Sequence, residues 1–96
     1  MKPKVEIGDR LWHIKQDKND KDNRKTIIRI TDIKMGDLYP AYIYFGKLYW
    51  SYPDGTEQEM IGFDDVSYFE VDLWKSLDRG KWLEEKRDLK LKQLLN

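Results

Sequence analysis

Alternating apolar and polar side chains predict two strands in the first third of the chain. In residues 10–14, Trp12 and Ile14 fall on one face, and residues 26–33 repeat the alternation with β-branched side chains. The segment between them, residues 15–25, contains no apolar side chain. We therefore expect two antiparallel strands joined by a solvated loop or hairpin tip.

The middle of the chain predicts an aromatic hairpin. Residues 41–45 and 48–52 each alternate as strands do, and Gly46 reads as the turn between them. We expect the inner face of this hairpin to carry Ala41, Ile43, Phe45 and Trp50. The outer face then carries Tyr42, Tyr44 and Tyr49. A fifth strand, short or bulged, is expected within residues 60–71.

The last quarter of the chain reads as helical. Asp72 is a plausible N-cap for residues 73–77, Gly80 interrupts, and residues 81–95 form a helix rich in Leu, Lys and Glu. At about 100° per residue, one side of this helix carries Leu83, Leu91, Leu94 and Leu95. The opposite side carries Trp82 and Leu89. One stripe can cover the sheet, and the other meets residues 73–77 or is left for a second chain.

These elements predict a mainly β fold with a C-terminal helix. We expect a small five-stranded antiparallel barrel or curled sheet packed by one helix. At 96 residues the chain supports one core, so residues 1–96 form a single domain, with the β part at 5–71 and the helical segment at 72–96. Because cysteine is absent, the core holds without disulfides.

Charge is balanced overall but unevenly distributed. Basic and acidic side chains both number 18, which argues against a protein that mainly wraps the nucleic-acid backbone. Residues 1–30 carry nine basic and five acidic side chains, residues 31–72 carry two and nine, and residues 73–96 carry seven and four. These segments either neutralise one another within the fold or present a bipolar surface to a charged partner.

No segment has the composition of a membrane anchor. The first residues lack the apolar run of a signal peptide, and no later stretch approaches the roughly 18 apolar residues of a spanning helix. We therefore expect a cytoplasmic protein without membrane association.

The residues that could carry chemistry form no recognisable site. His13 is the one histidine, and no motif around it indicates a catalytic triad or a zinc site. The charged loop at 15–25 lacks the turn glycine and terminal glutamate of an EF-hand. Asp64 and Asp65 are adjacent, which suits a turn or cap better than a metal site. We expect no enzyme activity, no catalytic residues, no metal and no cofactor.

Four segments of the chain carry a resemblance to a known group of proteins. They are the Gly8-Asp9 turn before the strand with Trp12, the strand at 26–30, and the segments 39–45 and 52–55. Together they resemble small phage and prophage proteins of unknown function, which look like SH3-like barrels of the Tudor/KOW sort. The resemblance covers about residues 5–71 and implies an SH3-like barrel fold.

Two features depart from that pattern. The loop at 15–25 is longer than the usual connection of such a barrel, and the C-terminal helix is an addition. A more distant likeness, carried by the Gly8-Asp9 turn before a strand, is to the Tudor-like RNA-polymerase-interaction domains of bacterial transcription factors.

The leading functional hypothesis is a non-enzymatic interaction module that binds a protein partner. Its candidate surfaces are the aromatic hairpin face and the C-terminal helix, because tyrosine combines an apolar body with a polar tip. The candidate partner-binding residues are Tyr42, Tyr44, Tyr49, Trp82 and Leu89. A homodimer through the helix is one form of this hypothesis.

The alternative hypothesis is a nucleic-acid-associated barrel. In that case the tyrosines stack bases and the loop at 15–25 contacts the phosphate backbone. The two hypotheses differ in salt response, because phosphate contacts weaken steeply as salt is added.

Overall fold

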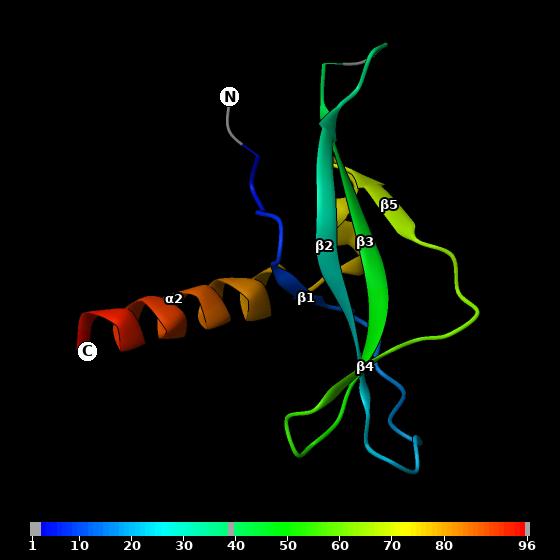
Figure 1. Ribbon diagram of the computed structural model, residues 1–96, viewed down its shortest axis with the longest axis vertical. Coiled ribbons are helices and arrows are strands. Elements are labelled where there is room, and N and C mark those ends of the chain that lie inside the picture. The colour runs from blue at the N-terminus through cyan, green and yellow to red at the C-terminus, as the bar shows by residue number, and fades with distance from the viewer. Residues whose placement is uncertain (1–2, 39, 96) are drawn as a thin grey trace.

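The computed structural model describes residues 3–38 and 40–95. Five strands precede two helices along the chain (Figure 1). In order, the elements are β1 (Arg10–Trp12), β2 (Lys25–Met35), β3 (Tyr42–Ser51), β4 (Glu57–Glu59), β5 (Val66–Phe69), α1 (Leu73–Ser76) and α2 (Arg79–Leu95).

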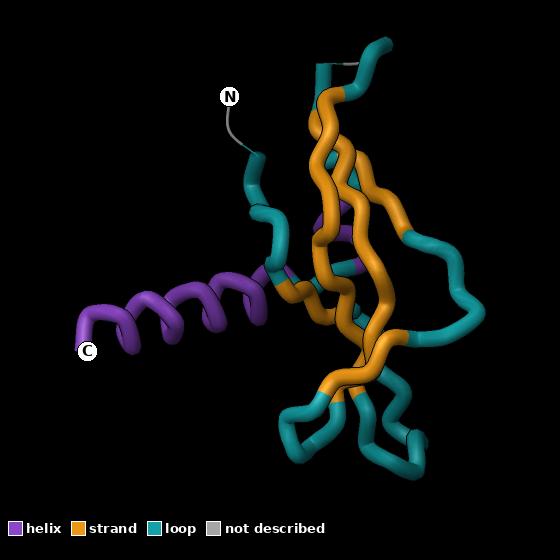
Figure 2. The backbone as a smooth tube through the Cα atoms, in the orientation of Figure 1, coloured by secondary structure: helices purple, strands orange, loops and turns teal. Residues whose placement is uncertain are grey.

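All five strands belong to one antiparallel sheet. The order is β1-β2-β3-β4, and β5 also pairs with β3 (Figure 2). The long β2–β3 hairpin forms the centre of the sheet. Two strands pair with the other edge of β3: β4 with Tyr49–Ser51, and β5 with Ile43–Gly46. The mainly β fold, with five antiparallel strands and a C-terminal helix, is confirmed.

The sheet is not closed into a barrel, so the barrel, one of the two forms expected from the sequence, is wrong. The outer edge of β1 and the residues after it are hydrogen-bonded to residues 76–78, at the end of α1 and just beyond it, instead of to another strand. The Asp78 N–H donates to the Trp12 carbonyl at 2.7 Å. The Ile14 N–H donates to the Ser76 carbonyl at 2.9 Å. With these main-chain groups occupied, β1 has no free edge there with which to close the sheet.

The expected turn at Gly46 is also wrong, because Gly46 lies inside the continuous strand β3. It pairs with Ile30 beside a register shift between Ile30 and Asp32. A Cβ atom at Gly46 would lie 2.5 Å from Cγ2 of Ile28 and 2.9 Å from the Arg29 carbonyl oxygen. Glycine is therefore needed here for the close approach of two strands, a role that sequence alone does not separate from a turn.

The remaining short strands fall near their expected places. β5 lies within the predicted range 60–71, whereas no strand was expected at the polar residues that form β4. Polar side chains are tolerated in β4 because it is a three-residue edge strand.

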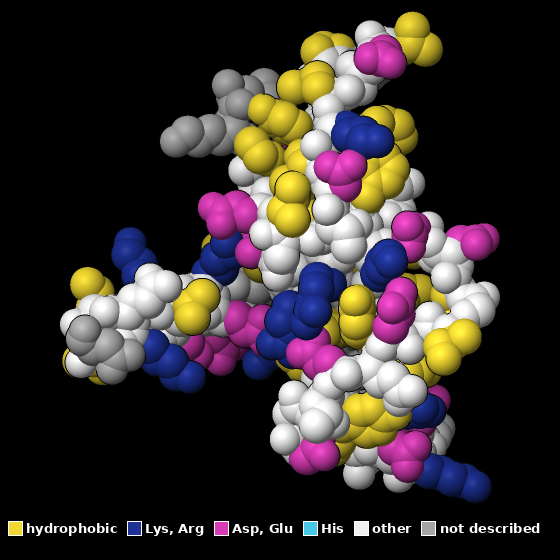
Figure 3. All heavy atoms as spheres, in the orientation of Figure 1, with side chains coloured by type: hydrophobic (Ala, Val, Ile, Leu, Met, Phe, Trp, Pro, Cys, Tyr) yellow, Lys and Arg dark blue, Asp and Glu magenta, His cyan; other side chains and the backbone are white. Residues whose placement is uncertain are grey.

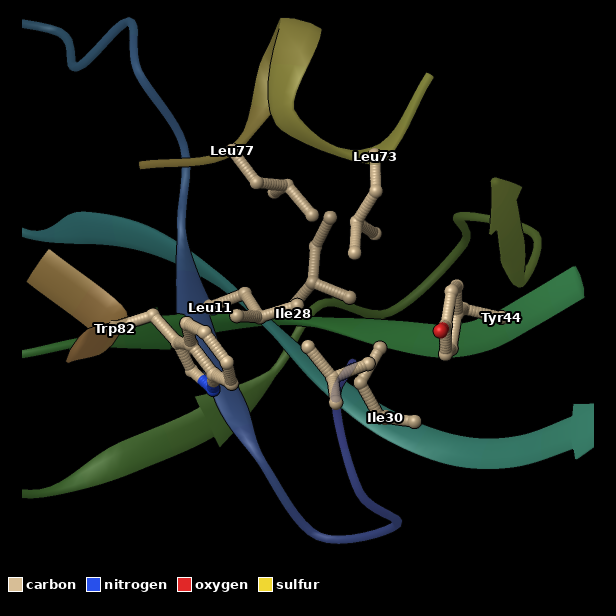
Figure 4. Close-up of a cluster of buried hydrophobic side chains, with 8 residues drawn as sticks. Leu11, Ile28, Ile30, Tyr44, Leu73, Leu77 and Trp82 are labelled. Carbon is tan, nitrogen blue, oxygen red and sulfur yellow. The ribbon is translucent and has the colours of Figure 1, made fainter. Parts of the chain in front are cut away.

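The core lies between the sheet and the α1 segment (Figure 4). Leu73 and Leu77 point from α1 and its C-terminal end toward Ile28 on β2 (Figure 4). The strands add other fully or almost fully buried side chains, namely Leu11, Ile30 and Tyr44. The short helix α1, and not the long C-terminal helix, therefore covers this face of the sheet.

α2 projects from the sheet after a capped start (Figure 1). The Asp78 carboxylate accepts the Lys81 N–H at 2.9 Å, which satisfies one free donor of the first turn. Gly80 lies within this first turn and does not interrupt the helix. Asp72 does precede α1, but its side chain makes no cap hydrogen bond and instead pairs with Lys75 at 2.7 Å.

Candidate interaction surfaces

The expected inner and outer faces of the 41–45 segment are exchanged. Tyr44 is 0% exposed and belongs to the core cluster, whereas Ile43 lies on the opposite face of the sheet, in the row that pairs it with Phe69. The Lys4 N–H donates to the Tyr44 hydroxyl at 2.9 Å, and that hydroxyl donates to Glu70 at 3.1 Å. Burial raises the pKa of Tyr44 above its ordinary value. Tyr44 is thus a satisfied core residue and presents no binding surface.

The other two candidate tyrosines lie on different faces of the sheet. Tyr42 is half-buried against the core, with its ring 6.5 Å from that of Tyr44. Tyr49 lies on the outer face beneath the guanidinium of Arg29, which is 4.9 Å from the ring centroid. Arg29 is held in turn by Glu57 at 3.1 Å. The structure therefore does not bring Tyr42, Tyr44 and Tyr49 together into one platform.

Trp82 anchors α2 to the body of the protein. It is 9% exposed, and its ring lies 5.2 Å from that of Trp74. Its indole N–H donates to the Asp9 carboxylate at 3.0 Å, and Lys86 pairs with the same carboxylate at 3.0 Å. Asp9 follows Gly8, whose φ of +94° favours glycine. The Gly8-Asp9 turn thus fixes the start of the helix, a role that the sequence analysis did not assign to it.

A second tryptophan strengthens this attachment. The Trp12 indole N–H on β1 donates to Glu85 at 2.7 Å. The ammonium group of Lys81 lies 5.5 Å from the centre of the same ring. Both contacts involve the first two turns of α2, so the attachment ends where the helix leaves the sheet.

Beyond these turns the helix is exposed on all sides. Every side chain from residue 87 to residue 95, here called the projecting segment, is exposed. It includes the candidate residue Leu89 together with Leu91, Leu94 and Leu95. Leu94 and Leu95 are 75% and 85% exposed. In the space-filling view, hydrophobic and basic side chains are interspersed along this helix (Figure 3).

An apolar groove lies at the end of the β2–β3 hairpin, and sequence reasoning missed it. Its volume is about 710 Å³. The lining residues are Gly36, Asp37, Leu38, Ala41, Ile43, Phe69, Val71 and Asp72. Ile43 on β3 and Phe69 on β5 are paired across the sheet and form the floor of the groove. Val71 lies at the edge of the groove and is 79% exposed. Hydrophobic side chains gather over this end of the sheet (Figure 3).

The charged loop between β1 and β2 is ordered by its own side chains. Arg24 pairs with Asp20 at 3.0 Å and covers the Trp50 ring at 4.2 Å. The hydrogen bonds from Arg24 lower the pKa of the Asp20 carboxyl. Gln16 accepts the Thr26 N–H at 2.7 Å and so closes the base of the loop. Of the eight charged side chains in residues 15–25, Asp20, Asp22 and Arg24 form ion pairs within the loop.

The remaining polar candidates form no cluster. Burial lowers the pKa of His13 below its ordinary value of 6.5, more than a hydrogen bond to the Ser76 backbone raises it. Asp64 and Asp65 are exposed and lie in the loop before β5. Across residues 3–38 and 40–95, no three His, Asp or Glu side chains are grouped as metal ligands would be.

Comparison with protein-family models, curated proteins and solved structures finds no match for this chain. Among the described residues, no helix has both the length and the apolar composition that crossing a membrane requires.

Proposed function

We propose that this chain is a non-enzymatic interaction module whose protein partner packs against the projecting segment of α2. The observation that carries this proposal is the exposure of all nine side chains from residue 87 to residue 95, four of them leucines. Exposed apolar residues gathered on one element are typical of an interaction site.

The physics of an isolated helix supports the same proposal. Helices shorter than about 12–15 residues are marginal in water on their own, and most helices in proteins are stabilised by packing of an apolar face. α2 has 17 residues, and only its first turns are attached to the sheet. A partner that covers the leucines would supply the packing that the rest of the helix lacks.

The change in the candidate surface follows from the structure. Trp82 anchors the helix and Tyr44 is in the core, so neither is available to a partner. Leu89 keeps its place as a candidate, and Leu91, Leu94 and Leu95 join it. The resemblance to SH3-like phage and prophage proteins, and with it a bacterial host, stays a prediction.

Photo-crosslinking tests the proposal at the level of a single residue. A photoreactive amino acid at position 94 is expected to crosslink to a protein, a second copy of the chain included, when the tagged chain is irradiated in nuclease-treated bacterial lysate. The same amino acid at position 18, in the charged loop, is expected to capture none. Capture should be abolished by Leu91→Asp, whereas Ile61→Asp introduces the same charge outside residues 87–95 and should retain it.

Two results would contradict the proposal. Equal capture at positions 94 and 18 would mean that the leucines attract proteins no more than any exposed residue does. Recovery of nucleic acid instead, lost steeply as salt is added, would favour the nucleic-acid alternative.

A further inference from the structure

We infer that the partner of the projecting segment is the apolar groove of a second copy of this chain. This inference rests on the proposed function, since it names the partner of the surface described there. In this arrangement each copy inserts residues 87–95 into the groove of the other, around a two-fold axis.

The two surfaces are chemically matched. The groove is lined by apolar side chains such as Leu38, Phe69 and Val71. The projecting segment offers four leucines, and Leu91, Leu94 and Leu95 lie on one side of the helix. Among the described residues, no part of the chain covers either surface, and Leu38 is fully exposed at the hairpin end.

The charges of the two surfaces are opposite. Among the described residues, the groove lining contains two charged side chains, Asp37 and Asp72, and both are acidic. Asp72 pairs with Lys75 of its own chain at 2.7 Å, and Asp37 has no basic partner among the described residues. The projecting segment contains three basic side chains and one acidic one. The ion pairs of α2 are made by Glu85 and Lys86. Among the described residues, Arg87, Lys90 and Lys92 have no acidic partner.

The wider charge distribution agrees with this match. Residues 31–72, which build most of the groove, carry seven more acidic than basic side chains (nine against two). Residues 73–96 carry three more basic than acidic ones (seven against four). Of the nine acidic side chains in residues 31–72, Asp37 and Asp72 line the groove, so an exchange of helices would bring the basic projecting segment against these two.

The fold directs the helix away from its own groove. α2 starts beside β1, while the groove lies at the far end of the β2–β3 hairpin, next to β5 (Figure 1). The anchor at Asp9 fixes the direction in which the helix leaves the sheet. The projecting segment is therefore placed to reach a neighbouring molecule.

A two-fold exchange of helices doubles the area that the two copies bury. A specific protein interface buries about 800 Å² on each partner, more than nine residues in one groove provide. A two-fold exchange contains the contact twice, because each copy gives one helix and one groove. This favours a closed dimer over an open chain of copies.

The test is the mass of the purified protein in solution, measured by sedimentation over a wide range of concentrations. The full chain is expected to form a dimer. Val71→Asp in the groove and Leu94→Asp in the projecting segment should each weaken that dimer at least about tenfold, because each places a charge in an apolar contact. Ile61→Asp, between β4 and β5, also replaces an exposed apolar side chain by a negative charge, but outside the contact, and should leave the dimer intact.

Mixing the two defective variants gives a sharper readout. A heterodimer of Val71→Asp with Leu94→Asp retains one sound contact, between the groove of the Leu94→Asp copy and the helix of the Val71→Asp copy. The mixture is expected to associate more tightly than either variant alone. A symmetric pairing of two α2 helices cannot give this result, because the groove does not take part in it.

Several outcomes would overturn the inference. The chain could remain monomeric at the highest concentration, or Leu94→Asp could abolish the dimer while Val71→Asp leaves it unchanged. If the chain is monomeric but position 94 still captures another protein, the proposed function stands and the second copy is wrong as its partner. If position 94 captures nothing either, both fail.

Discussion

The two helices of this chain carry leucine into very different surroundings. Leu73 in α1 and Leu77 at its end are 0% and 1% exposed, whereas Leu94 and Leu95 in α2 are 75% and 85% exposed. Helix length does not explain the difference, because the buried leucines belong to the short helix, α1, with four residues, and the exposed ones to α2, with 17. The position of each helix relative to the sheet decides which leucines are buried.

The position of α1 is set by backbone attachments at both of its ends. The Asp72 N–H donates to the Phe69 carbonyl at 2.9 Å, which turns the chain back onto the sheet directly after β5. The bridge between Leu77 and His13 then holds the other end of α1 against β1. α2 has attachments only at its start, and the rest of its apolar surface is available for a second molecule.

Truncating the leucines of the two helices is expected to give the largest contrast. Leu73→Ala and Leu77→Ala should each lower the free energy of unfolding by about 2–5 kcal/mol, because each leaves a cavity between α1 and the sheet. Leu94→Ala should change it by less than about 0.5 kcal/mol. Urea denaturation, followed by tryptophan fluorescence at dilute protein, measures all three.

Equal losses of stability in Leu73→Ala and Leu94→Ala would contradict this contrast. If Leu94→Ala destabilised the dilute protein as much as Leu73→Ala does, the leucines of α2 would be packed within the monomer. The measurement must be repeated at high protein concentration, where self-association would add stability to the wild-type chain.

A second contrast concerns two glycines, Gly46 within β3 and Gly80 in the first turn of α2. Gly46→Ala is expected to lower the free energy of unfolding by about 1–3 kcal/mol, because its Cβ would overlap Ile28 and the Arg29 backbone. Gly80→Ala should have the opposite sign and raise stability by up to about 1 kcal/mol, since alanine favours a helix. Its Cβ would meet only Asp78, at 3.4 Å.

Thermal unfolding of both glycine variants measures this pair of effects. A neutral Gly46→Ala variant would mean that β2 and β3 separate without cost. Position 46 would then behave as the turn that sequence reasoning expected.

Sequence patterns located most of the elements, because those patterns are local. Three segments have a composition that is typical of one kind of element. They are the strand at 26–33, the loop at 15–25, which has no apolar side chain, and the helix ending at residue 95. The start of α2 was missed by two residues because Gly80 reads as a breaker, although glycine is acceptable in a first turn. The closed barrel was wrong because edge pairing depends on residues 76–78, far from β1 in sequence.

The orientation of β3 could not be derived from the sequence for a different reason. Both of its faces are aromatic or aliphatic around residues 42–45, so alternation does not say which face is buried. Tyr44 turns inward because its hydroxyl finds partners at Lys4 and Glu70. The outward orientation of Ile43, and with it the groove, follows from that long-range contact.

The smallest expected effect is a dependence of stability on pH at the junction between β1 and the helices. Burial holds the pKa of His13 below 6.5 in the folded protein, so the unfolded chain binds the proton more tightly. Stability is therefore complete above the unfolded pKa and falls as the pH is lowered through the folded pKa. The urea midpoint of the wild-type chain should decrease between about pH 7.5 and about pH 5, above the range in which carboxylates titrate.

His13→Gln isolates this effect, because glutamine keeps a polar side chain but does not titrate. The variant should lose the decrease in that pH range while Leu73→Ala, although much less stable, keeps it. A wild-type midpoint that stays constant, or one that rises on acidification, would mean that the imidazole is as well solvated in the fold as in the unfolded chain. The attachment of β1 to residues 76–78 would then be looser than that of α1 to the sheet.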